Sequence, residues 1–320
     1  MLSEVDVLLF DLQDVGVRFY TYIWTLYLAM AAAGERDVEV IVLDRPNPLG
    51  DRMDGPVLEP ALASFVGLRE IPLRHGLTVG ELARLFAGEF LARPPALHVV
   101  RMSGYDPARH LDGYGLPWVP PSPNLPTRES AWAYPGTGLI EALDASEGRG
   151  TTVPFLWAGH SCLDEVAAVA LADELNAREL PGVLLRAMMT TPAAGKQSGL
   201  VCGGVQLHVT APDAFDGLRT GLRLVQALAA RPGVGWREET DLLPSGGGKA
   251  ETVPWIDRLT GTADVRRSLA AGIAPETIAA GWGDGLATFR ERAQPHRLYA
   301  LPPLPSADRP ARSGGGTIPG

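Results

Sequence analysis

Two apolar runs near the start of the chain flank a segment with helical spacing. Residues 5–10 and 38–43 are apolar apart from one acidic residue each, Asp6 and Glu39, and each run is followed by an aspartate, Asp11 or Asp44. Runs of this kind are typical of strands buried on both faces of a sheet. Residues 23–33 combine apolar positions at helical spacing with a high alanine content. This order predicts a β-α-β unit with parallel strands and a right-handed crossover.

The rest of the chain continues to alternate between predicted helices and strands. Thr78 and Glu81 have the spacing of a capping box and predict a helix through Phe90, and residues 97–102 predict a third strand. We therefore predict an α/β protein with a Rossmann-like parallel-sheet domain over residues 1–155, a smaller α/β domain over 156–301 and a disordered tail over 302–320. The elements predicted for the second domain are a helix over 163–180, strands over 183–186 and 205–209, a helix over 212–230, and shorter helices within 253–262 and 274–292.

The segment 115–155 interrupts this alternation. Its first half is crowded with prolines, and each proline fixes φ and removes a backbone donor. We therefore expect neither helix nor central strand over 115–135, and a short helix near 138–143. The first half also contains three aromatic side chains, Trp118, Trp132 and Tyr134, which is more than a solvated linker usually contains. A long ordered loop of this composition predicts a functional cleft.

Composition and charge argue against several classes of protein. The net charge of −9 argues against sequence-independent nucleic-acid binding, and no apolar run reaches the roughly 18 residues that span a bilayer. The first residues are acidic where a signal peptide is positively charged, so nothing predicts export and a cytoplasmic location is the default. Cys162 and Cys202 fit small buried hydrophobic residues better than a disulfide.

The motifs of several enzyme classes have no match. No G-x-G-x-x-G follows the first predicted strand, and the glycines before Lys249 lack the Walker spacing, so we expect no nucleotide cofactor. No H-E-x-x-H or paired C-x-x-C occurs, so we expect no metal. The segment around Ser161 is not a nucleophile elbow. The remaining candidates for catalytic groups are carboxylates in predicted loops.

Three carboxylates are the catalytic candidates. Glu147 is the strongest candidate, because the glycines on either side of Arg149 let the backbone approach a substrate. The alternative is that Glu147 pairs with Arg149 or caps a turn. Asp11 and Asp14 follow the first predicted strand and are candidates to position substrate hydroxyls, unless one of them caps the following helix.

A further set of side chains are candidates for substrate binding. Some follow the carboxyl ends of the predicted parallel strands, where ligands of such sheets bind. Others are cations that can hold an anionic ligand, although a surface salt bridge is favoured for any single one. The aromatic side chains form either a sugar-stacking wall or the packing of the loop. The candidates are Gln13, Arg18, Arg45, Asn47, Arg74, His75, Trp118, Asn124, Arg149 and Thr151.

Eight collinear segments give the chain a family resemblance that extends to about Tyr299. In order they are FDLQDVGVRFYTYIWTLYLAM, VLDRPNPLGDRMDGPVL, SFVGLREIPLRHGLTVGELARLF, GLPWVPPSPNLPT, YPGTGLIEA, SEGRGTTVPF, CGGVQLHVT and WIDRLTG. They resemble the DUF1343 family, whose characterised members are exo-β-N-acetylmuramidases of the NamZ type. The resemblance implies a Rossmann-like α/β domain joined to a smaller α/β domain. It also implies release of terminal N-acetylmuramic acid from peptidoglycan fragments during cell-wall turnover.

Two features differ from the family pattern. Members usually begin with a further segment containing Gly-Pro-Glu-His-Gly, whose glutamate is thought to be catalytic, and they commonly have Ala-Met-Glu where this chain has Met30 and Ala31. We therefore expect the first domain to be incomplete relative to the family. A cell-envelope or secreted location is compatible with the resemblance if the natural start lies upstream.

Our hypothesis is a muramidase-type glycoside hydrolase acting on a small sugar or muropeptide. One carboxylic acid would protonate the leaving oxygen and a second carboxylate would act as base or nucleophile. Glu147 is the first candidate, with the two aspartates in support. The lactyl carboxylate of muramic acid would need a fixed cation, for which Arg18, Arg45 and Arg149 are the candidates.

Two alternatives stay open. The first is a non-catalytic muropeptide-binding homologue that has kept the cleft and lost catalytic carboxylates. The second is a nucleotide-dependent sugar enzyme on a Rossmann-like sheet, which the missing glycine motif argues against. The sequence does not predict an oligomeric state.

Overall fold

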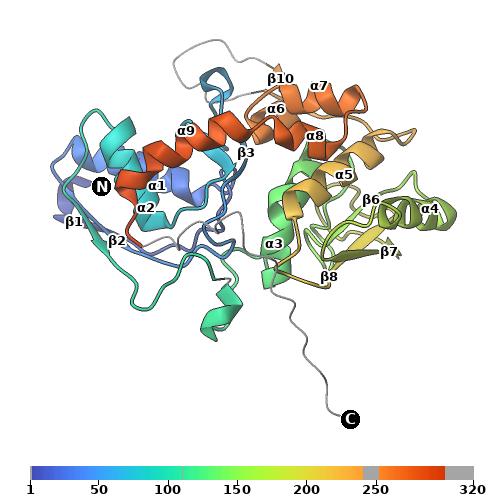
Figure 1. Cartoon of the computed structure of the whole chain (residues 1–320), viewed down its shortest axis with the longest axis horizontal. Helices are drawn as coiled ribbons and strands as arrows, with labels where there is room; N and C mark the ends of the chain where they lie inside the picture. The colour runs from blue at the N-terminus through green and yellow to red at the C-terminus, as the bar shows by residue number, and fades with distance from the viewer. Residues whose placement is uncertain (1, 110, 241–251, 300–320) are drawn as a thin grey trace, which may run out of the picture.

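The predicted β-α-β unit begins the fold. In the computed structural model, which describes residues 2–109, 111–240 and 252–299, β1 (Val7–Phe10) leads through α1 (Tyr22–Gly34) to β2 (Glu39–Leu43). β5 (Leu97–Val100) completes a three-stranded parallel sheet in the order β1-β2-β5. α1 and α2 (Val79–Leu85) pack on one face of this sheet (Figure 1). The predicted parallel α/β unit is confirmed.

Few of the residues that the structure describes cover the other face of the parallel sheet. Val7, Leu9 and Val100 lie on that face, and Leu9 is 60% exposed. Phe10 is buried toward the helices, as are Val40 and Val42 of the central strand. The expectation that the first strand is buried on both faces is therefore wrong. A mostly apolar run does not reveal whether a second layer packs against the strand.

The capping box predicted for α2 is present and is tied to the end of β2. The Thr78 hydroxyl accepts from the Glu81 N–H, and the Glu81 carboxylate accepts from the Thr78 N–H. Asp44, which follows β2, accepts from the Thr78 hydroxyl at 2.8 Å and from the Gly80 N–H at 2.8 Å. The Tyr299 hydroxyl donates to the same carboxylate at 2.7 Å. Asp44 therefore joins the sheet, a helix and the end of the described chain.

The second half of the chain contains an antiparallel sheet. β6 (Trp157–His160), β8 (Cys202–Val209) and β7 (Val183–Thr190) pair in the order β6-β8-β7. The predicted helices correspond to α4 (Glu165–Asn176) and α5 (Gly217–Ala229). β6 was not predicted, because its four residues include only two large or β-favouring side chains.

The proline-rich segment ends in a helix that the sequence analysis excluded. α3 (Arg128–Thr137) contains Pro135, so the expectation of no helix over 115–135 is wrong at its end. Thr127 and Ser130 form a capping box that starts the helix, and Pro135 removes a single donor close to its end. A 3₁₀ turn over Gly138–Ala142 follows, where a short helix was predicted.

The remaining elements are short. α9 crosses back from the second half to the first (Figure 1), and its Phe289 and Ala293 are buried in the cluster that contains Trp24 and Phe86. No helix in the described ranges is long and apolar enough to cross a membrane. The elements are the hairpins β3 (Asp54–Val57) with β4 (Pro72–Arg74) and β9 (Glu238–Thr240) with β10 (Thr252–Pro254), and helices α6 (Trp255–Thr260), α7 (Asp264–Ala270), α8 (Pro275–Ala280) and α9 (Gly283–Ala293).

The buried apolar side chains form two clusters that do not follow the order of the chain. The first lies between the parallel sheet, α1, α2 and α9. The second contains the antiparallel sheet, α3 and α5, and also includes Val17, Phe19 and Leu73 from the first half. The boundary near residue 155 stays a prediction, and the tail from residue 302 lies outside the described residues.

The return of α9 to the first cluster predicts a large effect of one substitution. Phe289 is buried, so Phe289→Ala should lower the free energy of unfolding by about 3–5 kcal/mol through lost burial and a residual cavity. The matched control is Phe65→Ala at an exposed phenylalanine, which should cost less than about 1 kcal/mol. Denaturant unfolding measures both, and equal losses would contradict the packing described for α9.

Candidate active site

A cavity of about 320 Å³ lies where the two halves of the chain meet. The segment before α1 supplies one wall, and α3, the 3₁₀ turn and α6 supply others. Its lining is aromatic and polar and contains a carboxylate and a guanidinium. The lining residues are Phe19, Tyr20, Thr21, Tyr22, Val66, Ser122, Tyr134, Glu141, Arg149, Trp255 and Leu259.

Glu141 is the carboxylate in the cavity wall. It lies in the 3₁₀ turn, its side chain is 21% exposed, and its Oε1 is 2.8 Å from Arg149 Nη1. Burial raises the pKa of the Glu141 carboxyl, and the nearby Glu147 charge raises it further, while Arg149 opposes both effects. The result is a carboxyl group that holds its proton to higher pH than an ordinary glutamate.

Glu147 lies behind the cavity wall and is held between two cations. It is 2% exposed, and its two oxygens contact Lys196 Nζ at 2.8 Å and Arg149 Nη1 at 3.0 Å. Burial raises the pKa of the Glu147 carboxyl, but Lys196 and Arg149 outweigh it and hold the pKa below its usual value. Because Glu141 and Glu147 share Arg149 Nη1, their nearest oxygens are at most about 6 Å apart. Their pKa values are shifted in opposite directions.

Lys196 joins the turn that carries Glu141 to the turn that carries Glu147. Its Nζ donates to the carbonyl oxygens of Ile140 and Leu143 at 2.9 and 2.8 Å, in addition to the ion pair with Glu147. Burial lowers the pKa of the Lys196 ammonium, and Glu147 partly offsets this. Three buried acceptors therefore surround one ammonium group.

The glycine turn around Arg149 brings the Lys196 loop into place. Gly148 and Gly150 have φ values of +87° and +78°, which favour glycine. A Cβ on Gly150 would lie 2.3 Å from Ala194 O, and the Ala193 N–H donates to Gly150 O at 2.8 Å. The close approach that the glycines permit is therefore to the chain's own loop, whereas the sequence analysis expected an approach to substrate.

Aromatic rings form one wall of the cavity. Tyr20 and Tyr22 have ring centroids 4.7 Å apart, and the Tyr22 hydroxyl donates to Pro121 O at 3.0 Å. Tyr134 meets Tyr20 edge to face. Burial raises the pKa of both Tyr20 and Tyr134, so these phenols stay neutral. The proline-rich segment thus supports the wall, and Tyr134 is the one predicted aromatic that lines it.

Two of the predicted residues form a surface ion pair. Asp11 and Arg45 lie beyond the ends of β1 and β2, with Asp11 Oδ1 2.6 Å from Arg45 Nη2. Both side chains are exposed, and neither lines the cavity. The sheet edge therefore brings them together, as expected for strand ends, but not at the cavity.

Asp14 and His75 form a buried pair. Asp14 Oδ2 accepts from the Gly16 N–H at 2.7 Å and lies 3.1 Å from His75 Nε2. His75 Nδ1 accepts from the Leu77 N–H, so Nε2 carries the proton that faces Asp14. Asp14 Oδ1 is buried with no hydrogen-bond partner among the described residues. Neither side chain lines the cavity.

Four predicted binding residues hold the backbone of the first half. Arg18 is fully buried and donates to Pro56 O, Ile71 O and Leu259 O at 2.8–3.0 Å. The others also bond main-chain groups: Gln13 donates to Asp14 O and Pro46 O, Asn47 donates to Leu77 O and accepts from the Leu49 N–H, and Arg74 donates to Leu49 O. These contacts give the buried Arg18 and Asn47 and the half-buried Gln13 and Arg74 hydrogen-bond partners within the fold itself.

The last three predicted binding residues lie in the long loop outside the cavity lining. Trp118 Nε1 donates to Leu125 O at 3.0 Å, and Thr151 Oγ1 donates to Gly148 O at 2.6 Å, so both stabilise turns of the loop. Asn124 is partly buried. Of the predicted binding residues, Arg149 alone lines the cavity.

Glu141 and Lys196 were not among the residues predicted from the sequence. Glu141 is the single charged residue in the apolar segment GLIEAL, a signal that could have been used. Lys196 is one of two lysines among the chain's 28 basic residues, so a lysine rather than an arginine at this position was a second signal. The described residues contain no group of three or more His, Cys, Asp or Glu that could hold a metal ion.

Comparison with known proteins assigns the family. Residues 1–129 match the N-terminal model of exo-β-N-acetylmuramidase NamZ, and residues 132–299 match its C-terminal model. The chain belongs to the NamZ family. The NamZ resemblance given by the sequence motifs is therefore confirmed.

Individual relatives agree with this family. The chain is 42% identical over 300 residues to the peptidoglycan β-N-acetylmuramidase NamZ of Bacillus subtilis, covering 93% of this chain and 69% of that protein. Two crystal structures of DUF1343 family proteins from Bacteroides fragilis superpose with TM-scores of 0.77 and 0.72 at 33% and 28% identity. The alignments cover 92% and 94% of this chain and 75% and 77% of those chains.

The ion pairs of Glu147 predict a stability that depends on pH. Because the pKa of Glu147 is lowered in the fold, its contribution is present above the unfolded pKa and is lost as pH falls through the folded pKa. Glu147→Gln should lower the free energy of unfolding at neutral pH by on the order of 3 kcal/mol, since it leaves buried cations without their anion.

Denaturant unfolding across the acid range measures this effect. The loss caused by Glu147→Gln should shrink as pH falls, because the wild-type carboxyl becomes neutral too. Glu35→Gln, at an exposed glutamate after α1, is the matched control and should leave the curve unchanged. A loss that is independent of pH would show that the charge of Glu147 is not what matters.

Proposed function

We propose that this chain is an exo-acting glycoside hydrolase that releases terminal N-acetylmuramic acid from peptidoglycan fragments. The observation that carries the proposal is Glu141, a carboxyl group with a raised pKa in the wall of an aromatic-lined cavity. A glycosidase needs such a group to protonate the leaving oxygen near neutral pH. Membership of the NamZ family and the activity of the Bacillus subtilis relative support the substrate class.

In this proposal Glu141 is the general acid. Its side chain lines the cavity, and the contact with Arg149 Nη1 fixes its orientation. The proton on Glu141 passes to the glycosidic oxygen as the bond from that oxygen to the anomeric carbon breaks, and a water molecule bonds to the anomeric carbon and gives up a proton to solvent, which yields the free sugar. Tyr20, Tyr22 and Trp255 would contact the sugar ring, since all three line the same space.

We assign Glu147 to positioning. Its carboxylate is buried, already contacts Lys196 and Arg149, and is absent from the cavity lining. A carboxylate in this state supports the neighbouring cations, and reaching a sugar would require breaking both ion pairs. Asp11 and Asp14 take no part in the proposed chemistry, because neither lines the cavity.

The charges around Arg149 favour an acidic sugar. When Glu141 is protonated, Arg149 and Lys196 carry two positive charges against the single negative charge of Glu147. The local excess of one positive charge would attract the lactyl carboxylate that distinguishes muramic acid from glucosamine. Arg149 is the arginine that could contact it, since Arg18 is buried on carbonyl groups and Arg45 is outside the cavity.

Removal of the proton on Glu141 should abolish most of the activity on a natural substrate. Glu141→Gln should lower kcat/KM by about 10²- to 10⁴-fold on a muramic-acid disaccharide, and by much less on a 4-nitrophenyl glycoside, whose leaving group needs no proton. In the wild type, kcat/KM should fall as pH rises through the raised pKa of Glu141, and this limb should vanish in the variant.

The control for this experiment is Glu129→Gln, at an exposed glutamate of α3 that does not line the cavity. It should leave kcat/KM unchanged. A wild-type chain that binds N-acetylmuramic acid in calorimetry but cleaves neither substrate would overturn the enzyme proposal in favour of a muropeptide-binding homologue. Equal losses on both leaving groups would remove Glu141 from the role of acid.

The charge argument predicts a preference between two substrates that differ in the lactyl group. Chromogenic β-N-acetylmuramide should be hydrolysed with a kcat/KM about tenfold or more above that of β-N-acetylglucosaminide, which corresponds to one charge-assisted hydrogen bond. Arg149→Lys should reduce the preference, because lysine cannot bind a carboxylate through two parallel donors. Equal rates for the two substrates in the wild type would refute the proposed lactyl contact.

A further inference from the structure

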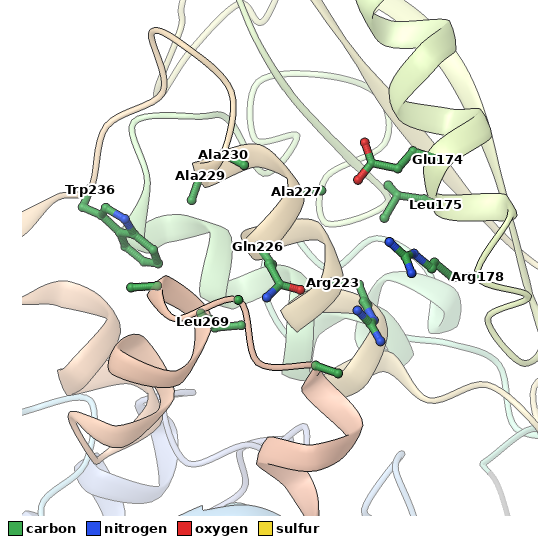
Figure 2. A pocket seen from close by; sticks show the side chains of 13 residues that line it. Glu174, Leu175, Arg178, Arg223, Gln226, Ala227, Ala229, Ala230, Trp236 and Leu269 are labelled. Carbon is green, nitrogen blue, oxygen red and sulfur yellow. The ribbon is translucent and has the colours of Figure 1, made fainter.

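A second and larger cavity, of about 590 Å³, is lined by residues of α4 and α5, by Trp236 and by residues from the end of α7 to Ala274. Figure 2 shows it between α4, α5 and the turn that joins α7 to α8. It shares no lining residue with the candidate active site. The proposed reaction therefore leaves this cavity unused.

One end of the cavity carries an unbalanced cation. Glu174 pairs with Arg231, and Arg223 pairs with Glu276, so these four charges cancel. Arg178, just after α4, makes no ion pair with any residue that the structure describes, and its guanidinium lies close to the cavity in Figure 2. The two glutamates would repel a polyanion, so the site favours a ligand with a single negative charge.

The other end of the cavity is an aromatic surface over a floor of small side chains. Trp236 is 37% exposed and lies at the opposite end from Arg178 in Figure 2. Ala227, Ala230 and Leu269 form the apolar floor between them. An exposed indole above small side chains leaves room for a flat ligand with apolar C–H faces, such as a sugar ring.

We propose that this cavity is a second saccharide site, with a sugar ring on Trp236 and its carboxylate on Arg178. The identity of the sugar rests on the proposed function, which supplies a polymer whose muramic acid residues each carry one free lactyl carboxylate wherever the stem peptide has been removed. A neutral saccharide would leave Arg178 without a partner. Holding the polymer here would raise the local concentration of chain ends at the candidate active site.

Calorimetric binding of the full chain to two glycans tests this inference: peptidoglycan freed of its stem peptides by an amidase, called peptidoglycan below, and chitin oligosaccharides, called chitin below. Both have a backbone of N-acetylated amino sugars, but only the first carries free lactyl carboxylates. The wild type should bind peptidoglycan more tightly than chitin, and added salt should reduce the difference. Arg178→Gln should weaken binding to peptidoglycan about threefold, and Trp236→Leu, which keeps an apolar side chain, should weaken it up to about tenfold.

Two controls separate this site from the candidate active site. Arg36→Gln, at an exposed arginine just after α1, makes the same charge change in the other half of the chain and should not alter binding. Turnover of a small chromogenic β-N-acetylmuramide should stay within about twofold of wild type in Arg178→Gln, because such a substrate fills only one site. Equal binding to the two polymers, or unchanged binding by both variants, would overturn the second site.

The outcomes also distinguish the two proposals. If the wild type binds peptidoglycan through Arg178 and Trp236 but cleaves nothing, the second site stands and the enzyme proposal fails. If turnover of the small substrate is normal and neither variant weakens binding to peptidoglycan, the second site alone is refuted. Thermal unfolding of each variant checks that the fold is retained. Because Arg178 is exposed, Arg178→Gln should disturb the fold less than Trp236→Leu.

Discussion

The ammonium group of Lys196 is the contact on which the candidate active site depends. It meets a carboxylate and two main-chain carbonyl oxygens, so its positive charge is matched in a place where water is largely absent. Burying both members of an ion pair is costly unless each has further partners. Glu147 has its second partner in Arg149, and Arg149 extends the network to Glu141 and stacks on Phe155. A series of ion pairs thus extends from Lys196 in the interior through Glu147 and Arg149 to Glu141 in the cavity wall.

A second set of buried contacts holds the two walls of the cavity together. Arg18 donates to carbonyl oxygens in the first half and to Leu259 O in α6, so it fixes α6 against the β3–β4 hairpin. Leu259 and Trp255 of α6 line the cavity. Burial lowers the pKa of Arg18 to about 9, which reflects how fully the guanidinium is removed from water. An arginine that resembles a ligand-binding group in the sequence therefore acts on the shape of the site.

The sequence predicted the fold better than the site, and the reason is physical. Apolar periodicity and caps are local, so the β-α-β unit, the Thr78 capping box and α5 could be predicted from neighbouring residues. The partners of a charged side chain are not local. Glu147 was singled out by its glycines, but its burial depends on Lys196, almost fifty residues later, and on the turn that carries Glu141.

The same limit explains the errors in the first half. The candidates at the ends of β1 and β2 were grouped correctly, because parallel strands place their ends together. Whether that edge borders a cavity depends on segments that pack there from elsewhere in the chain. Leu9 shows the limit for packing as well, since its exposure depends on the absence of a covering layer among the described residues.

The path of α9 has a consequence for how the protein is made. Phe289 and Ala293 complete a cluster whose other members lie mainly in the first ninety residues. During synthesis on the ribosome, the parallel sheet and its helices emerge long before these two side chains do. Until α9 arrives, the part of the cluster that Phe289 and Ala293 cover is exposed in the nascent first half, so this half can reach its final packing only after residue 293 has been synthesised.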